Sequence, residues 1–264
     1  MKTLKRIAAG ILSTALLLGM TSCAAANQTE AANTASFTTI ESGKLIMATN
    51  AFFPPYEYYE GDKVVGIDVE IATAVAQKLG LELVIEDVEF DSIIAGVQGG
   101  KYDIGCAGMT VTEDRLKSVN FSTPYATGIQ SIIVTADSEI TDIDKLLEGD
   151  YKVGVQSGTT GDIYMSDEIG EDRVERYAKG NDAVIALTSG KIDAVVIDNE
   201  PAKAFVKSND GLKVLDTPYT IEDYAMAINK DNVALKDAIN QALKELTDDG
   251  TIPAIINKYI PAEG

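Results

Sequence analysis

Apolar and polar positions along this chain follow two different periods in turn. Between residues 66 and 80 the apolar residues recur every three or four positions and the run stops at Gly80, which predicts an amphipathic helix. Short, nearly continuous apolar runs at 44–50 ("KLIMATN") and 81–88 ("LELVIEDV") predict strands. Strands that alternate with helices are typical of an α/β fold whose sheets are largely parallel.

The same alternation continues to the end of the chain. Asp91 is a candidate N-cap for a short helix over 90–100, and an irregular, aromatic-rich loop is predicted over 52–63. The other predicted strands are 102–108, 127–135, 152–156, 192–198 and 224–229, and the other predicted helices are 141–149, one opening in 157–165, 181–190, 199–208, 232–250 and 252–259. A helix, then Gly-Lys, then Asp and a buried strand occurs twice, around Lys101 and Lys191. This arrangement indicates either two similarly built lobes or simply a common helix–strand unit.

The start of the chain has the plan of a secretory signal peptide. Three positive charges within residues 1–6 precede an apolar run over 7–20 that is short for a membrane span. "MTSC" at 20–23 resembles the bacterial lipobox, with methionine in place of the usual leucine, which makes Cys23 the expected site of lipid attachment. We therefore expect a signal peptide over 1–22 and, over 23–40, a flexible tether of small and polar residues. An ordinary secreted protein with an incidental cysteine is the alternative.

Composition and charge exclude several classes of function. Removing residues 1–22 takes away three basic and no acidic residues, so the charge of the remainder is 19 minus 41, or −22. Nucleic-acid binding needs clustered Lys and Arg, and we expect none. The chain has no histidine, which excludes Ser-His-Asp and Cys-His catalysis and histidine zinc sites. Cys106 reads as a small apolar residue of a buried strand. No metal site and no cofactor are predicted.

A polar stretch follows the predicted strand 102–108 directly. In "CAGMTVTEDR", residues 106–115, Thr110 and Thr112 alternate and Arg115 closes the run. Ala107–Thr110 and Asp198 would lie just past the carboxyl ends of comparable strands, where ligands bind in open parallel sheets. A guanidinium such as that of Arg115 pairs with a carboxylate through two parallel hydrogen bonds, and Thr112 can cap a short helix. An exposed Arg115 paired with a neighbouring acid is the alternative reading.

These stretches resemble the extracytoplasmic solute-binding proteins of polar amino-acid ABC transporters, including the glutamine-binding and lysine/arginine/ornithine-binding proteins. The resemblance spans about residues 44–260 and is closest over 48–58, 66–80, 90–125 and 154–161 ("GVQSGTTG"). It implies a two-lobed, periplasmic-binding-protein-like α/β fold. Each lobe would have a mostly parallel sheet flanked by helices, and two hinge strands would join the lobes.

The resemblance also implies how the α-carbon groups of an amino acid are held. Arg115 would bind the α-carboxylate, together with the backbone N–H groups of Thr110 and Thr160. Asp198, the Gly108 carbonyl and the Thr110 hydroxyl would bind the α-ammonium. A buried ammonium is well satisfied by one carboxylate and two neutral acceptors.

The side chain of the ligand is less constrained by the resemblance. Phe53 and Phe90 match the two aromatic residues that enclose it, although ordinary core packing is the alternative for both. Asn50 stands where both comparison families carry aspartate, and Gln156 is a second neutral residue at a variable contact position. Two neutral amides weaken the case for a dibasic ligand and favour a polar side chain.

The resemblance gives the domain plan and the expected function. Lobe one would comprise 41–127 plus 223–264 and lobe two 128–222, with hinges near 126–131 and 222–227. The protein would be a monomer, held on the outer face of the bacterial cell membrane by lipid on Cys23. It would deliver an L-amino acid to an ABC transporter permease and would not be an enzyme. Two alternatives remain: an amino-acid sensor lipoprotein, and a cyclohexadienyl dehydratase on the same fold, for which Glu57 and Glu200 are the candidate acids.

Overall fold

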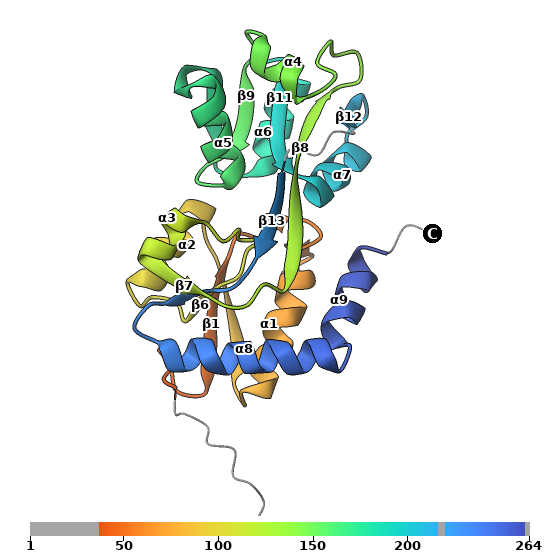
Figure 1. Ribbon diagram of the computed structural model, residues 1–264. Helices are drawn as coiled ribbons and strands as arrows, with labels where there is room; N and C mark the ends of the chain where they lie inside the picture. Colours follow the sequence, from red (N-terminus) through yellow and green to blue (C-terminus); the bar gives the residue numbers. More distant parts are fainter. Residues whose placement is uncertain (1–36, 216–219, 262–264) are drawn as a thin grey trace, which may run out of the picture. The chain divides into compact units, whose positions relative to one another are not determined.

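The computed structural model describes residues 37–215 and 220–261. The predictions for the signal peptide 1–22, for lipid attachment at Cys23 and for the tether up to residue 36 fall outside these residues. The described part of the chain contains a five-stranded sheet, a six-stranded sheet and a small three-stranded sheet. Helices cover both large sheets, so this is the α/β class that the periodicity predicted (Figure 1).

The five-stranded sheet is built mainly from the first half of the chain. Its strand order is β5-β1-β6-β14-β7; β1 pairs with β5 and β6 in parallel, and β14 pairs with β6 and β7 in antiparallel orientation. Side chains of β1 alternate between the two faces. Leu45 and Met47 pack in the cluster that contains α1 and α8, while Ile46 and Ala48 pack with α2. The bounds are β1 Lys44–Thr49, β5 Glu82–Asp87, β6 Ile104–Gly105, β7 Val119–Phe121, β14 Ala227–Asn229, α1 Ile67–Lys78, α2 Phe90–Gln98, α3 Glu113–Ser118, α8 Val233–Asp248 and α9 Thr251–Tyr259.

The six-stranded sheet has the same plan. Its order is β10-β9-β11-β8-β12, with β13 also paired to β8; β10, β9 and β11 are parallel, and β8 is antiparallel to its partners. Helices α6 and α7 pack on one face, with Val195 and Ile197, and α4 and α5 on the other, with Ala194 and Val196. The bounds are β8 Ala126–Thr135, β9 Val153–Gln156, β10 Val174–Tyr177, β11 Ala194–Asp198, β12 Leu212–Val214, β13 Thr220–Tyr224, α4 Ile143–Glu148, α5 Thr160–Ile169, a 3-10 turn Glu171–Arg173, α6 Gly180–Thr188 and α7 Asn199–Ser208.

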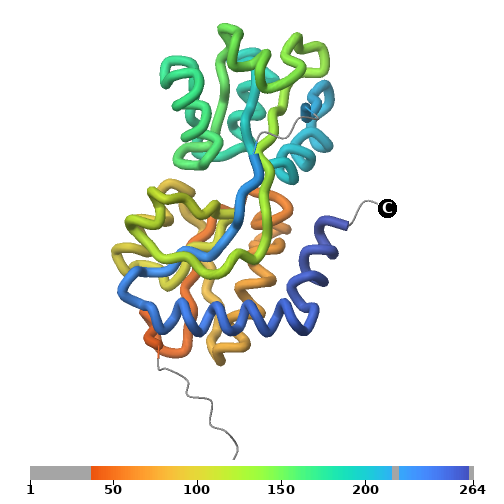
Figure 2. The backbone as a smooth tube through the Cα atoms, in the orientation of Figure 1, coloured from red at the N-terminus to blue at the C-terminus, as the bar shows by residue number. Residues whose placement is uncertain are grey.

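Two paired strands carry the chain between the sheets (Figure 2). β8 and β13 are antiparallel, with Ala126 opposite Tyr224 and Gly128 opposite Glu222. A Cβ atom on Gly128 would lie 2.2 Å from the Tyr224 hydroxyl oxygen, so this position has room only for glycine. These segments overlap the expected hinges near 126–131 and 222–227. The exact domain bounds, 41–127 plus 223–264 and 128–222, stay a prediction.

Several local predictions were wrong. The expected loop over 52–63 contains most of the three-stranded sheet, β2 Phe52–Phe53, β3 Glu57–Glu60 and β4 Lys63–Val65. Strands of two to four residues are too short to show an alternating pattern. Asp91 does not cap α2, which begins at Phe90; its carboxylate accepts a hydrogen bond from the Ser157 hydroxyl. The short strands β7, β10 and β12 were not predicted either, because each has three or four residues and lies at a sheet edge.

Cys106 follows β6 directly and is fully buried. Its thiol lies 3.5 Å from the Tyr125 hydroxyl, and burial raises its pKa well above the usual range, so it is not poised as a nucleophile. Within 37–215 and 220–261, no helix combines the length and apolar character that crossing a bilayer requires. The same residues contain no cluster of three or more cysteine or acidic side chains placed to hold a metal ion.

Candidate functional site

Every ligand residue predicted from the sequence lines one small cavity between the two large sheets. The lining residues are Asn50, Phe53, Glu57, Phe90, Ala107, Gly108, Thr110, Arg115, Gln156, Thr159, Thr160 and Asp198. The cavity volume is about 20 Å³, which is room for about one water molecule. An amino acid is too large for this cavity and can bind there only if the walls move apart.

Arg115 lies on α3, whose first turn is capped by the Thr112 hydroxyl, as predicted. Its guanidinium is buried, and the alternative of an exposed arginine is wrong. It donates one hydrogen bond to the Thr110 carbonyl, at 2.7 Å, and one to the Gly158 carbonyl, at 3.0 Å. The guanidinium also lies 5.4 Å from the centre of the Phe90 ring. Both hydrogen-bond acceptors are neutral, and among the described residues this buried cation forms no ion pair.

The loop between β9 and α5 brings backbone donors to the same cavity. Gly158 has a φ of +74°, and a Cβ atom there would lie 2.9 Å from the Cβ of Asp91. Only glycine lets the loop approach α2 this closely. Thr159 then caps α5 through its hydroxyl, and Thr160 is the first residue of that helix. Free N–H groups at a helix start favour a negative charge.

Asp198 ends β11 on the opposite side of the cavity from α3 and is nearly inaccessible to solvent. One carboxylate oxygen accepts from the Tyr224 hydroxyl, and the other accepts from the Gln130 amide at 2.9 Å. Burial above all, together with the nearby Glu222 carboxylate, raises the pKa of Asp198 to about 7. Asp198 is thus a buried carboxyl that would gain strongly from a cationic partner.

A second buried acidic pair borders the cavity beneath Gly108. Asp68 accepts hydrogen bonds from the Gly108 N–H and the Tyr125 hydroxyl, both at 2.7 Å. Glu57 packs against Asp68, and burial together with the Asp68 charge raises the pKa of Glu57 well above its usual range. Burial raises the pKa of Asp68 as well, although the two hydrogen-bond donors against it oppose this rise. Asp68 also fixes Gly108 at a φ of +51°.

The far end of the cavity is lined by aromatic rings and neutral amides. Phe53 and Phe90 are both buried, whereas Phe52 lies outside the cavity beneath the Lys179 ammonium, 3.5 Å from its ring centre. The Gln156 amide nitrogen donates to the Asn50 side-chain oxygen at 2.9 Å and to a backbone carbonyl, and Asn50 donates to the Val88 carbonyl. The amides therefore already hold each other in place.

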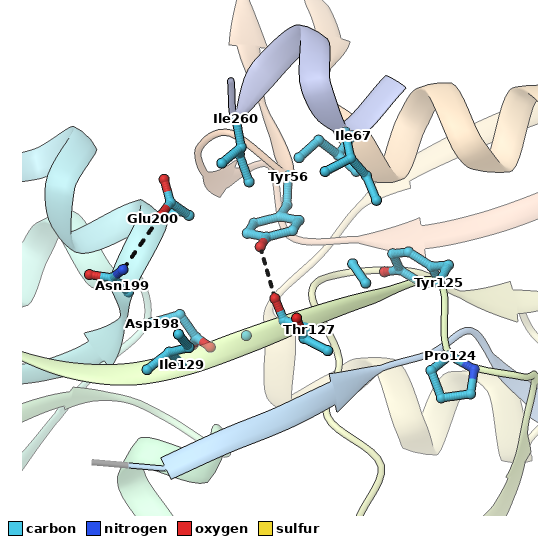
Figure 3. A pocket seen from close by; sticks show the side chains of 13 residues that line it. Tyr56, Ile67, Pro124, Tyr125, Thr127, Ile129, Asp198, Asn199, Glu200 and Ile260 are labelled. Carbon is cyan, nitrogen blue, oxygen red and sulfur yellow. Dashed lines mark hydrogen bonds between the residues drawn. The ribbon is translucent and has the colours of Figure 1, made fainter. Parts of the chain in front are cut away.

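A larger cavity of about 440 Å³ lies beside strand β8 (Figure 3). Its walls include Tyr56, the β8 residues 126–129, Asn199 and Glu200 from α7, and Ile260 near the end of α9. We call it the rear cavity. Asp198 lines both cavities and so separates them. Glu200 lines only the rear cavity, which places one of the two candidate dehydratase acids away from the predicted ligand residues.

Sequence reasoning did not select every residue of this site. Glu57 entered only as a possible catalytic acid, and Thr159 was not chosen although it adjoins Thr160. Gln130 and Glu222, which hold Asp198 and Thr160 in place, were missed entirely. The available signal was their position on the two predicted hinge strands, because polar residues are unusual at buried strand positions.

Comparisons with known proteins agree with this fold. The family model of the bacterial extracellular solute-binding proteins, family 3, matches residues 45–262. The arginine-binding extracellular protein ArtP of Bacillus subtilis is 36% identical over 235 residues, which cover 84% of this chain and 89% of ArtP.

Solved structures of similar proteins cover most of the chain as well. The arginine-, lysine-, histidine-binding protein ArtJ of Geobacillus stearothermophilus superimposes with a TM-score of 0.79 at 31% identity, covering 84% of this chain and 96% of ArtJ. An ancestral arginine-binding protein bound to glutamine gives a TM-score of 0.78 at 38% identity, covering 83% of this chain and 98% of that protein. The periodicity, the two sheets, the cavity residues and these matches lead to one conclusion: this chain belongs to the bacterial extracellular solute-binding proteins, family 3.

Proposed function

We propose that this protein binds a free L-amino acid in the cavity between its two sheets and delivers it to the permease of an ABC transporter. The placement of two opposite charges carries this proposal. Arg115 from α3 and Asp198 from the end of β11 line the same small cavity and form no ion pair with each other. A zwitterion supplies the missing partner of each group in a single molecule.

The α-carboxylate would lie against Arg115 and the start of α5. The guanidinium would exchange its bond to the Gly158 carbonyl for a stronger, charge-assisted pair with the carboxylate. The free N–H of Thr160 at the helix start would add a further donor. The α-ammonium would lie against Asp198, with the Gly108 carbonyl and the Thr110 hydroxyl as neutral acceptors.

Arginine is the leading candidate for the ligand. ArtP, ArtJ and the ancestral protein all carry arginine in their names, and the ancestral protein was solved with glutamine bound. Asn50 lacks the carboxylate that would pair with a cationic side chain, but the Glu57–Asp68 pair supplies a carboxyl on the cavity wall. A guanidinium near this pair would favour ionisation of Glu57, while Asn50 and Gln156 can accept hydrogen bonds from its N–H groups.

Replacing Glu57 by glutamine should separate cationic from neutral ligands. Glutamine keeps the shape of the side chain, but it cannot ionise. We expect arginine to bind about 10- to 100-fold more weakly, in line with the loss of one charged hydrogen bond, whereas glutamine should bind within about threefold of the unchanged protein. Isothermal titration calorimetry with both amino acids measures this difference.

Glu60 offers a matched control, because it is exposed and lies on the same strand, β3. Glu60→Gln should leave both affinities unchanged. An equal loss of arginine and glutamine binding in Glu57→Gln would show that Glu57 only supports the fold around Gly108, and the cationic preference would be abandoned.

The proposed function itself is tested by a thermal-shift screen of the purified protein against the common L-amino acids. A ligand at 100 times its dissociation constant adds roughly 2.7 kcal/mol to the free energy of unfolding, which is readily detected. We expect arginine or a related polar amino acid to give the largest shift. If no amino acid raises the melting temperature, the binding proposal is wrong.

Membership of the solute-binding family favours binding over the dehydratase alternative, and of the two candidate acids for that role only Glu57 lines the small cavity. A sensor lipoprotein would use the same site, so the two binding roles differ in partner rather than in ligand. Loss of amino-acid uptake in cells lacking this protein would identify the transport role. Unchanged uptake would favour the sensor.

We also propose that the mature protein is a monomer anchored outside the cell membrane by lipid on Cys23. The support is the charged start, the short apolar run and "MTSC". Cys23→Ser should move the protein from the membrane fraction to the soluble extracellular or periplasmic fraction without changing ligand affinity. If the variant stays in the membrane fraction, Cys23 is not the anchor.

A further inference from the structure

Two buried carboxyl groups share one hydrogen-bond donor beside the predicted ammonium position. The Gln130 amide nitrogen donates to Asp198 and to Glu222, each at 2.9 Å. The two accepting oxygens therefore lie no more than 5.8 Å apart, which is twice 2.9 Å. At such a separation, in a buried setting, two negative charges oppose each other's ionisation.

The orientation of Gln130 follows from this pair. Its amide oxygen is buried and has no hydrogen-bond partner. Turning the amide over would place that oxygen against both carboxyls, which is worse than leaving it unpaired. Glu222 is also held by α5, because the Thr160 and Tyr164 hydroxyls donate to its carboxyl at 3.0 and 2.8 Å.

The charge of this pair is not balanced locally. Within 37–215 and 220–261 neither Asp198 nor Glu222 forms an ion pair. Arg115 interacts electrostatically with both carboxyls, but its hydrogen bonds go to backbone carbonyls instead. The titratable and charged side chains around Asp198 are Glu222 and Tyr224 from β13, Tyr56 and Glu57 from the segment around β3, Arg115 from α3, Glu200 from α7 and Tyr164 from α5.

We propose that the buried Asp198 carboxyl, which shares the Gln130 donor with the Glu222 carboxylate, holds a proton in the ligand-free protein and loses it when an α-ammonium group binds. Glu222 is then a positioning residue, which acts on the ligand through Asp198. The step is balanced in charge: the pair changes from one negative charge to two, the ligand brings one positive charge, and one proton goes to water. The inference rests on the proposed function, since it requires an amino ligand.

The rear cavity gives the proton a separate way out. Asp198 lines it, and its walls include Pro124 and Thr127, which are exposed (Figure 3). A proton leaving Asp198 can therefore reach solvent without passing the ligand in the closed cavity. The raised pKa of Asp198, about 7, places this exchange near neutral pH.

Calorimetry in buffers of different ionisation enthalpy counts the protons released. With arginine, or the amino acid that binds most tightly in the screen, we expect about half a proton or more released per ligand at pH 6.5 and almost none at pH 8.5. Affinity should rise by up to about tenfold per pH unit between pH 5.5 and 7, and then level off. Binding without proton release anywhere between pH 5.5 and 7.5 would overturn the inference but leave the binding function intact. Failure of every amino acid to bind would instead overturn the proposed function.

Two conservative variants should shift this pH profile in opposite directions. Glu222→Gln removes the like charge, so the pKa of Asp198 falls and the midpoint should move down by about one pH unit. Tyr224→Phe removes the hydroxyl that stabilises the ionised form, so the midpoint should move up. A purely structural role for these residues would weaken binding equally at all pH values.

Glu175→Gln serves as the control, because Glu175 lies on β10, pairs with Lys152 and lines neither cavity. Its profile should match that of the unchanged protein. If Glu222→Gln does not fold, Tyr224→Phe alone still decides. An unshifted midpoint in a folded variant of either residue would contradict the coupling.

Discussion

Arg115→Ala lowers the affinity for every amino acid that binds by at least about 100-fold, while the protein stays folded. Removing one partner from a buried, hydrogen-bonded charge pair typically costs about 2–5 kcal/mol of binding free energy. Arg115 is the one basic side chain among the residues found to line the cavity. Without it, the ligand carboxylate would have to give up its water for the backbone donors of Thr110 and Thr160 alone. Isothermal titration calorimetry gives the loss, and circular dichroism checks the fold.

Two further variants make this result specific. Arg115→Lys keeps the charge but not the planar fork, so it should lose less affinity than alanine and more than about tenfold. Lys117→Ala removes an exposed cation from the same helix and should change nothing. Affinity within about threefold of the unchanged protein in Arg115→Ala would remove Arg115 from the proposed site.

Asp198→Asn should abolish binding and, at the same time, stabilise the ligand-free protein at neutral and alkaline pH. The folded pKa of Asp198, about 7, lies above its ordinary value of 3.8. Ionising this carboxyl is therefore easier in the unfolded chain, so its contribution to stability falls as the pH rises from about 4 to about 7. Asparagine carries no charge and can still accept from Gln130 and donate to the Tyr224 oxygen.

The gain in unfolding free energy should be on the order of 2–4 kcal/mol at pH 8 and should vanish toward pH 4. Urea unfolding at several pH values measures it, and the same samples titrated with ligand give the loss of affinity, which we expect to exceed about 100-fold. Asp193→Asn, at an exposed position near the start of the same strand, is the control. Equal stability of Asp198→Asn and the unchanged protein at pH 8 would mean that the ionised Asp198 carboxylate does not destabilise the empty protein.

Long periodic segments were predictable from the sequence because burial on one face leaves a repeat. Helix 66–80 and the strands around Leu45 and Val195 appeared close to where they were expected. The strands of the three-stranded sheet were not predicted. They pair with neighbours only a few residues away, and each has only two to four residues, which is too few to show alternating buried and exposed side chains. Edge strands such as β10 carry charged residues that read as solvent-exposed loop.

The cavity was predictable only where the resemblance supplied the roles. Arg115 alone reads as a surface residue of a polar stretch, and its burial depends on Gly158, which lies 43 residues further along the chain. Glu57 could not be recognised as buried, because the residues that cover it, such as Asp68 and Gly108, come from other segments. The role proposed for Glu222 depends on its hydrogen bond with Gln130, which is 92 residues away in the sequence. Such contacts leave no local pattern.

In the empty protein the Gly158 carbonyl accepts a hydrogen bond from Arg115, and so it would compete with a ligand for the guanidinium. A ligand would have to break this hydrogen bond before its own bond to Arg115 could add to the binding free energy. A neutral carbonyl, as in an amino-acid amide or ester, would exchange one such bond for another of similar strength. An ionised carboxylate makes a bond roughly twice as strong. In the proposed site, the closed loop would therefore set a threshold that free amino acids pass and their uncharged derivatives do not, so blocked or peptide-linked residues would be rejected.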